Sequence, residues 1–295
     1  MYLSPIGEDT IITCPECGYT ANRQIASFKK EYYKEEMLPL EKVSTPDTKT
    51  IEELTALLKI GPEKTCKMVF MVGSFINDKT GEEEDKLVVA AIRGDMDVEE
   101  SKLSNAIKAN ALRPAHPEEI EEYGMVPGFA SPIGAKKGFV LCVDDSVAES
   151  NNLVAGANEP GFHYINSNYK RDWDGGIVAD IASAKEGYTC PVCGKKLNSS
   201  KGVEIGNIFQ LGTRYSKAMN CTYQDENGVQ QPVIMGCYGI GVGRLLACLA
   251  EEYNDEKGLF LPITVAPYSV HLVSLLKDNA VGEKIYEELV NAGIE

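Results

Sequence analysis

The spacing of apolar residues predicts a helix that begins just after Thr50. Four apolar side chains recur at helical spacing and would share one face. They are Ile51, Leu54, Leu57 and Leu58. Thr50 and Glu53 have the spacing of a capping box, in which each side chain accepts a hydrogen bond from the backbone of the other residue. Gly61-Pro62 would end the helix.

Apolar runs with the character of strands follow this helix. Two of them, at 68–72 and 87–92, are joined by a polar loop that contains glycine, which predicts a β-hairpin. Helices are expected at about 98–109 and after Pro117, and a strand at 138–143. We expect residues 46–168 to form one compact α/β domain. The charged, weakly patterned segment that leads into this domain is interpreted as a linker.

The second half of the chain returns to the patterns of a sheet. Antiparallel strands are predicted at 203–211, 218–223 and 232–235, followed by a helix at 245–252. The last stretch offers one strand at 269–275 and one helix at 282–292. Half of an α/β layer leaves an apolar surface without a partner, so we expect the chain to be a fragment of a longer protein.

Two Cys-x-x-Cys-Gly turns lie far apart in the sequence. Cys14 and Cys17 belong to the first, and Cys190 and Cys193 to the second. Each turn would direct two thiolates at one point, as a tetrahedral zinc site requires. The alternative is a thioredoxin-like redox pair, which needs a single motif at a strand-to-helix junction. We expect structural zinc, with the two turns in contact and most of the intervening chain forming an inserted domain.

Size and charge limit the possible partners. A chain of 295 residues that is 43% hydrophobic can fill two or more domains. A net charge of −15 argues against general affinity for nucleic acid, although a local basic surface could bind RNA or simply be a solvated face. The candidate lysines are Lys29, Lys30, Lys34, Lys136, Lys137, Lys195, Lys196 and Lys201. Nine cysteines, no secretory signal and no apolar run of membrane-spanning length predict a protein of the reducing cytoplasm with no membrane partner.

The glycine-rich segment from Gly236 to Arg244 fits neither common nucleotide-binding loop. It lacks the Gly-Lys-Ser/Thr ending of a P-loop, and its glycines do not have the spacing of the dinucleotide fingerprint. A purine ring could lie against the glycine backbone while Arg244 binds a terminal phosphate. A tightly packed joint between a strand and a helix is an equally good interpretation of the residues alone.

Two sequence blocks carry a resemblance to a known family. Residues 203–216 (VEIGNIFQLGTRYS) and 233–244 (VIMGCYGIGVGR) resemble bacterial-type prolyl-tRNA synthetases, and the second block is similar to motif 3 of class II synthetases. The resemblance extends over essentially the whole chain. It implies an α/β (α+β) fold in which residues 1–45 and 169–262 form part of the class II antiparallel sheet. Residues 46–168 would be an inserted YbaK-like α/β editing domain, and residues 263–295 the start of an α/β anticodon-binding domain.

The resemblance also implies an activity and a set of site residues. The parent enzyme would be a homodimer that attaches proline to tRNA(Pro), using ATP with Mg²⁺. Arg244 would contact the γ-phosphate, and the adenine and proline sites would be formed by other residues of the two blocks. The adenine side is expected at Gly239, Gly241 and Gly243, and the proline side at Gln210, Thr213 and Cys237. The zinc held by the two cysteine turns would be structural, because four thiolates leave no open coordination position.

The inserted domain would remove alanine misattached to tRNA(Pro). Such a step is needed because a pocket sized for proline cannot strongly reject a smaller amino acid, a missing methylene being worth only about 1 to 3 kcal/mol. By resemblance, Lys67 meets the 3′ end of the tRNA and the loop from Gly128 to Pro132 orients the ester carbonyl. Asp144 and His163 would shape the alanine pocket. Without the resemblance, an ordinary interpretation is favoured for three of these features: a surface lysine for Lys67, a plain turn for Gly128 to Pro132 and a buried core histidine for His163.

Some parts of the family pattern do not occur in this sequence. Class II motifs 1 and 2 are missing, so this chain alone is expected not to form prolyl-adenylate. Three hypotheses follow: a fragment of a proline–tRNA ligase, an autonomous deacylase of alanyl-tRNA(Pro), and a zinc-ribbon interaction module without catalysis. Release of alanine from alanyl-tRNA(Pro), and its loss on substitution of Lys67, would separate the second hypothesis from the third.

Overall fold

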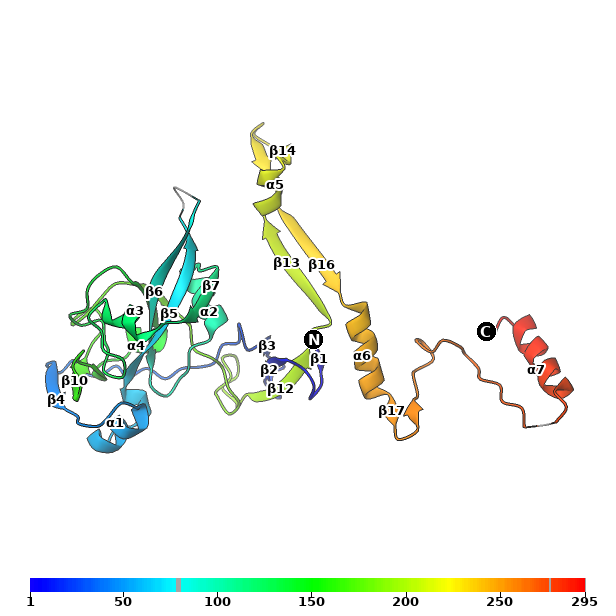
Figure 1. Cartoon of the computed structure of the whole chain (residues 1–295), viewed down its shortest axis with the longest axis horizontal. Helices are drawn as coiled ribbons and strands as arrows, with labels where there is room; N and C mark the ends of the chain where they lie inside the picture. Colours follow the sequence, from blue (N-terminus) through cyan, green and yellow to red (C-terminus); the bar gives the residue numbers. More distant parts are fainter. Residues whose placement is uncertain (78–80, 276, 295) are drawn as a thin grey trace. The chain divides into compact units, whose positions relative to one another are not determined.

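The structure is a computed structural model that describes residues 1–77, 81–275 and 277–294. It divides into two compact units, Asp9–Ser200 and the combination of Met1–Glu8 with Lys201–Glu295. Both units contain helices and strands (Figure 1), so the predicted mixed α/β class is confirmed. Among the described helices, none combines the length and the apolar character needed to cross a bilayer.

A five-stranded sheet forms the centre of the unit Asp9–Ser200. Its strand order is β11-β8-β6-β5-β7. The strands are β5 (Cys66–Ile76), β6 (Glu83–Arg93), β7 (Ala111–Pro114), β8 (Val140–Asp144) and β11 (Ile177–Ala179). β5 and β6 pair antiparallel from Cys66 opposite Arg93 to Ile76 opposite Glu83, which confirms the predicted hairpin and lengthens both strands. β8 is parallel to β6 and β11 is parallel to β8, so the carboxyl ends of these three strands lie at one edge.

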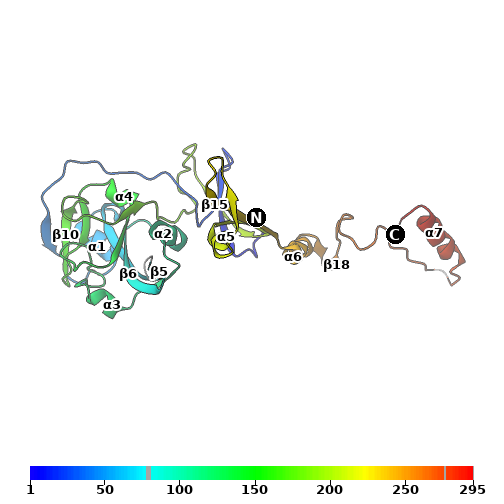
Figure 2. The same ribbon diagram turned by 90° about the horizontal axis from the view of Figure 1, so that it is seen from above.

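Alternate residues of the sheet face two apolar layers. Val89 and Val143 belong to the layer that contains Ile120 and Val147, while Val88 and Cys142 belong to the layer that contains Leu103. The helices around the sheet (Figure 2) are α1 (Ile51–Leu58), the 3₁₀ turn η1 (Pro62–Lys64), α2 (Glu100–Ile107), α3 (Pro117–Glu121) and α4 (Asp145–Ala148). α1 begins with the predicted capping box, since Thr50 Oγ1 accepts a hydrogen bond from the Glu53 N–H at 3.2 Å.

Two smaller groups of strands complete this unit. β4 (Glu41–Ser44), β10 (Phe162–Ser167) and β9 (Leu153–Gly156) form a three-stranded antiparallel sheet in that order. His163 on the middle strand lies opposite Val43 on one side and Gly156 on the other. β2 (Asp9–Thr13) pairs with β3 (Thr20–Asn22) around the first cysteine turn.

Residues 26–40, which we call the strap, have no regular secondary structure but are not a free linker. The Asn151 N–H donates to the carbonyl of Tyr33 at 2.8 Å, and the Asn152 side chain donates to the carbonyl of Glu36 at 2.8 Å. Arg171 donates to the carbonyl of Leu38 at 2.6 Å. The interpretation of this segment as a linker is wrong, because its backbone is bound by residues far away in the sequence, which a local pattern cannot show.

The second unit contains the remaining elements. They are β1 (Tyr2–Leu3), the end of β12 (Asn198–Val203), β13 (Gly206–Gly212), α5 (Arg214–Ala218), β14 (Thr222–Gln224), β15 (Gln230–Pro232), β16 (Met235–Ile240), α6 (Val242–Glu252), β17 (Asn254–Asp255), β18 (Gly258–Leu259) and α7 (Ala280–Asn291). The strand predicted at 203–211 is interrupted, and the strand predicted at 218–223 begins only at Thr222. The strand predicted at 269–275 is wrong: these residues are exposed, and within the described chain no strand pairs with them.

Candidate functional site

The four cysteines of the Cys-x-x-Cys-Gly turns lie together in the unit Asp9–Ser200. Their sulfur atoms are all within 4.8 Å of one another. Sγ of Cys14 is 3.4 Å from Sγ of Cys193, and Sγ of Cys17 is 3.6 Å from Sγ of Cys190. The glycine after each turn has φ 75° and donates its N–H to the backbone carbonyl of the first cysteine of the turn, at 3.0 and 3.1 Å. The prediction that the two turns meet is confirmed.

The sulfur cluster has the dimensions of a zinc site. Four Zn–S bonds of about 2.3 Å in a tetrahedron place the sulfurs about 3.8 Å apart, close to the separations found here. Burial disfavours the Cys190 thiolate, but the backbone N–H groups of Cys193 and Val192 lower its pKa to about 7. The Tyr19 N–H favours the Cys17 thiolate, but burial and the neighbouring thiols raise its pKa to about 12. Four sulfur donors at these separations fit one tetrahedral zinc ion.

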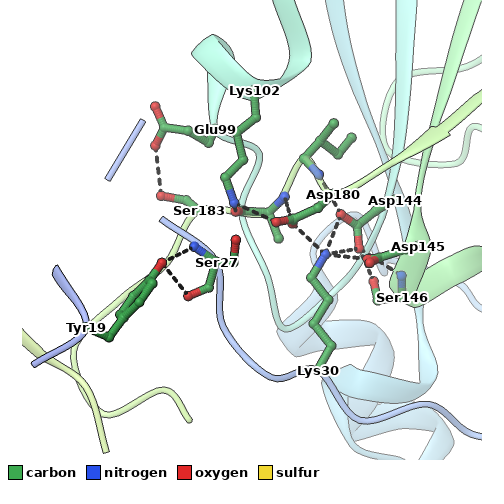
Figure 3. Close-up of polar contacts among 12 residues, drawn as sticks. Tyr19, Ser27, Lys30, Glu99, Lys102, Asp144, Asp145, Ser146, Asp180 and Ser183 are labelled. Carbon is green, nitrogen blue, oxygen red and sulfur yellow. Dashed lines mark hydrogen bonds and ion pairs between the residues drawn. The ribbon is translucent and has the colours of Figure 1, made fainter. Parts of the chain in front are cut away.

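Lys30 of the strap ends among three carboxylates, drawn in Figure 3. Nζ donates to both carboxylate oxygens of Asp144 at 3.0 and 2.9 Å, to Asp180 at 2.7 Å, and to Asp145. The Lys30 side chain is 2% exposed. Burial alone would lower its pKa, but the charge of Asp144 and the hydrogen bonds to Asp145 and Asp180 raise the pKa of Lys30. The expectation that Lys30 could contact a polyanion is wrong, because its charge is buried and fully used.

The beginning of the strap is attached to both cysteine turns. Tyr19, which follows the first turn, accepts a hydrogen bond from the Ser27 N–H at 2.8 Å (Figure 3). The ring of Phe28 lies 4.5 Å from the ring of Tyr188, which precedes the second turn. The strap thus connects the sulfur cluster to the carboxylates at the edge of the central sheet.

A cavity of about 240 Å³ lies between α1, the beginning of β5 and the small sheet. It is lined by Lys49, Thr50, Ile51, Leu54, Cys66, Lys67, Met68, Phe70, Gly128, Ala130, Gly156 and His163. The structure therefore brings together three of the residues named from the sequence: Lys67, Gly128 and His163. Thr50 and Gly156 were not foreseen as lining residues, although the capping box and a glycine in an apolar strand were visible signals at these positions.

His163 is a buried, neutral residue of this cavity. It is 5% exposed, and its Nδ1 lies 2.6 Å from Thr45 Oγ1. Its ring lies 5.4 Å from the ring of Phe129, in a tilted arrangement. Burial lowers the pKa of His163 to about 4, because the site favours the uncharged imidazole. At neutral pH this side chain can shape the cavity and exchange a hydrogen bond with Thr45, but it brings no charge.

Two lysines, Lys49 and Lys67, line the cavity, and Lys67 brings a positive charge to it. Its ammonium lies 3.0 Å from Asp97, which also pairs with Lys185 at 2.6 Å. The Lys67 side chain is 26% exposed, so part of it stays accessible from solvent. Cys66 beside it is a poor nucleophile, since burial raises the pKa of its thiol to about 12.

Asp144 and Pro132 lie outside the lining of this cavity. Asp144 is fully buried and caps α4, accepting from the N–H groups of Ser146 and Ile181 at 3.0 Å each in addition to Lys30. Pro132 lines a separate groove of about 570 Å³. The resemblance implies that Asp144 shapes the alanine pocket, but Asp144 is not among the residues that line this cavity.

The glycine-rich segment forms one strand of a two-stranded hairpin and the start of a helix. β13 and β16 pair antiparallel, with Gln210 opposite Gly236 and Phe209 opposite Cys237. Strand alternation places Gln210 and Cys237 on opposite faces. Thr213 directly precedes α5, and Gly239 lies near the end of β16. Gly241 is the cap of α6, with Gly243 and Arg244 in its first turn. Arg244 donates to the Glu204 carbonyl and is 55% exposed.

Comparisons with known proteins agree with the resemblance. Residues 45–172 match the family model of the aminoacyl-tRNA editing domain. The chain is 46% identical over 301 residues to the proline–tRNA ligase of Salinispora tropica, covering 100% of this chain and 50% of that protein. It is 45% identical over 300 residues to the proline–tRNA ligase of Dehalococcoides mccartyi, covering 100% of this chain and 51% of the relative.

A third relative, the proline–tRNA ligase of Thermotoga maritima, is 42% identical over 298 residues, covering 98% of this chain and 49% of the relative. The chain thus spans about half the length of the curated relatives it matches. The resemblance to prolyl-tRNA synthetases, with an editing domain inside the matched region, is confirmed.

Proposed function

We propose that this chain hydrolyses the ester between alanine and tRNA(Pro), and that it works as part of a proline–tRNA ligase that uses ATP to attach proline to the same tRNA. One observation carries the first part of the proposal. Every residue that lines the 240 Å³ cavity, from Lys49 to His163, falls within the residues 45–172 that match the editing-domain model. The position of this cavity and the family match thus coincide.

The residues that line the cavity would have different roles in binding and orienting the substrate. The Lys67 ammonium would attract a phosphate of the tRNA 3′ end, while the backbone of the loop at Gly128 would orient the ester carbonyl. His163 and Phe70 would limit the space around the amino acid. Water attacks the ester carbonyl and the bond to the ribose oxygen breaks, so alanine leaves as the acid and the ribose oxygen regains a proton. The resemblance assigns activation of the water to the neighbouring ribose hydroxyl, and the high pKa of Cys66 argues against a thiolate nucleophile.

Structural zinc belongs to this proposal. Cys14, Cys17, Cys190 and Cys193 would hold the ion, and four sulfur ligands leave no position for substrate. The ion would hold together the two chain segments that lead into and out of the editing region, and it would take no part in the reaction.

The aminoacylation half of the proposal rests on the sequence match to the relatives. In it Gly239, Gly241 and Gly243 lie along the adenine of ATP, Arg244 binds the γ-phosphate, and Mg²⁺ accompanies the nucleotide. Gln210, Thr213 and Cys237 contribute to the proline site. The parent enzyme is proposed to be a cytoplasmic homodimer.

The test is release of labelled alanine from alanyl-tRNA(Pro) by this chain. We expect release well above the rate without protein, and loss of at least about tenfold in Lys67→Ala. Lys185→Ala is the matched control, because it removes the same charge and the same Asp97 partner but lies outside the cavity lining. Absence of release by the wild-type chain, with zinc bound, would favour the non-catalytic zinc-ribbon module instead.

A further inference from the structure

Asn158 binds the backbone of the neighbouring loop at four points. Its N–H donates to the carbonyl of Phe129 at 2.8 Å. Its side-chain Oδ1 accepts from the Ser131 N–H at 3.0 Å, and its Nδ2 donates to the carbonyls of Ser131 at 2.9 Å and Ile133 at 2.8 Å. Both donor hydrogens of the amide and its acceptor oxygen are therefore used on one short stretch of chain.

The backbone around Asn158 is adapted to this contact. Asn158 has φ 51°, in the left-handed region that asparagine adopts more readily than most residues. Two residues earlier, a Cβ on Gly156 would lie 2.1 Å from the carbonyl carbon and oxygen of Phe129. Glycine at that position lets the loop lie directly on the end of β9, and Asn158 then fixes it there.

The loop held in this way forms one wall of the cavity. Gly128 and Ala130 line the cavity, and Phe129 between them packs against His163. Asn158 itself is not among the lining residues. We propose that Asn158 is a positioning residue for the reaction, which sets the place of the Gly128–Pro132 backbone relative to the ester carbonyl. This inference rests on the proposed editing function.

Asn158→Gly removes the side-chain amide and leaves a residue that adopts positive φ without strain. The chain offers a matched control in Asn152, which has φ 59°. The Asn152 amide also binds backbone, donating to Glu36 at 2.8 Å and accepting from Leu38 at 3.0 Å, but it holds the strap and not the loop. Both substitutions remove a comparable set of hydrogen bonds, so a general loss of stability affects both.

Two measurements on the full chain decide the proposal. In deacylation of alanyl-tRNA(Pro), Asn158→Gly is expected to lower kcat at least about tenfold with KM within about twofold, whereas Asn152→Gly keeps kcat within about twofold of wild type. In hydrogen exchange, the Ser131 amide is expected to exchange at least about tenfold faster in Asn158→Gly than in wild type or Asn152→Gly. Equal kcat, or equal exchange at Ser131, in Asn158→Gly and wild type overturns the proposal.

The outcomes separate this proposal from the proposed function. If the wild-type chain releases no alanine, the editing function fails, while the exchange experiment still decides whether Asn158 holds the loop. Should Asn158→Gly not fold, Asn158→Asp replaces it. An ionised carboxylate at this position repels the carbonyls of Ser131 and Ile133, whereas a protonated one can donate a hydrogen bond to them. The kcat of Asn158→Asp, relative to that of wild type, should therefore recover as the pH falls. A ratio that does not change with pH overturns the proposal.

Discussion

Replacing Lys30 by methionine tests whether Lys30 stabilises the fold by neutralising the carboxylates of Asp144, Asp145 and Asp180, which together with Lys30 form a buried cluster of charges. The substitution removes the ammonium and keeps a long side chain in the same space. It leaves the fully buried Asp144 without its counter-charge, next to Asp145 and Asp180, whose carboxylates lie within 4.8 Å. Removing one partner of a buried ion pair typically costs about 3 to 5 kcal/mol. Asp180 keeps Lys102 at 2.9 Å, so we expect the low end of this range, about 3 kcal/mol.

Urea unfolding followed by circular dichroism measures this loss. With a slope of roughly 2 kcal/mol per molar urea, the midpoint should fall by roughly 1.5 M. Lys34→Met is the matched control on the same strap. Lys34 is 69% exposed and pairs with Glu149 at 3.1 Å, so its substitution should change the free energy of unfolding by less than about 1 kcal/mol.

The pH dependence provides a second check on the same reasoning. A protonated carboxyl needs no counter-charge, and burial raises the pKa of Asp145, so the difference in stability between wild type and Lys30→Met should shrink as the pH falls and Asp145 takes up its proton. Equal urea midpoints for Lys30→Met and Lys34→Met at neutral pH would refute the view that the buried charge is held by Lys30.

Two further predictions concern the cysteine cluster and His163. Elemental analysis should find about one zinc per wild-type chain and none in a variant with Cys14→Ser and Cys190→Ser. This variant should also unfold at a lower temperature than wild type. If removing the metal from the wild-type chain leaves its stability unchanged, the zinc ion has no structural role. For His163, the folded-state pKa of about 4 lies below its ordinary 6.5, so its neutral form stabilises the fold above pH 6.5 and this contribution is lost as the pH falls towards 4. The loss amounts to roughly 3 kcal/mol, and His163→Gln, followed by urea unfolding across this pH range, should lack that part of the decline.

The sequence predicted the elements whose signals are local. The capping box at Thr50, the hairpin of β5 and β6 and the shape of the two cysteine turns depend on residues a few positions apart. The strap was misread because its bonds to Asn151, Asn152 and Arg171 come from more than a hundred residues away. Lys30 of the strap looked like a solvated charge in the sequence, since its burial depends on three carboxylates that converge only in the folded chain.

The strap also shows that the structural unit is larger than the editing-domain match. Residues 45–172 include Asp144 but not Lys30, and they exclude Asp180 as well. A piece cut at these limits would keep the buried carboxylate and lose its counter-charge and the N–H of Ile181 that it accepts from. Because the strap also attaches to Tyr19 and packs against Tyr188, the cysteine turns and the cavity-bearing sheet are held by one continuous set of contacts. The compact unit Asp9–Ser200 contains every buried charge of the cluster together with its partners.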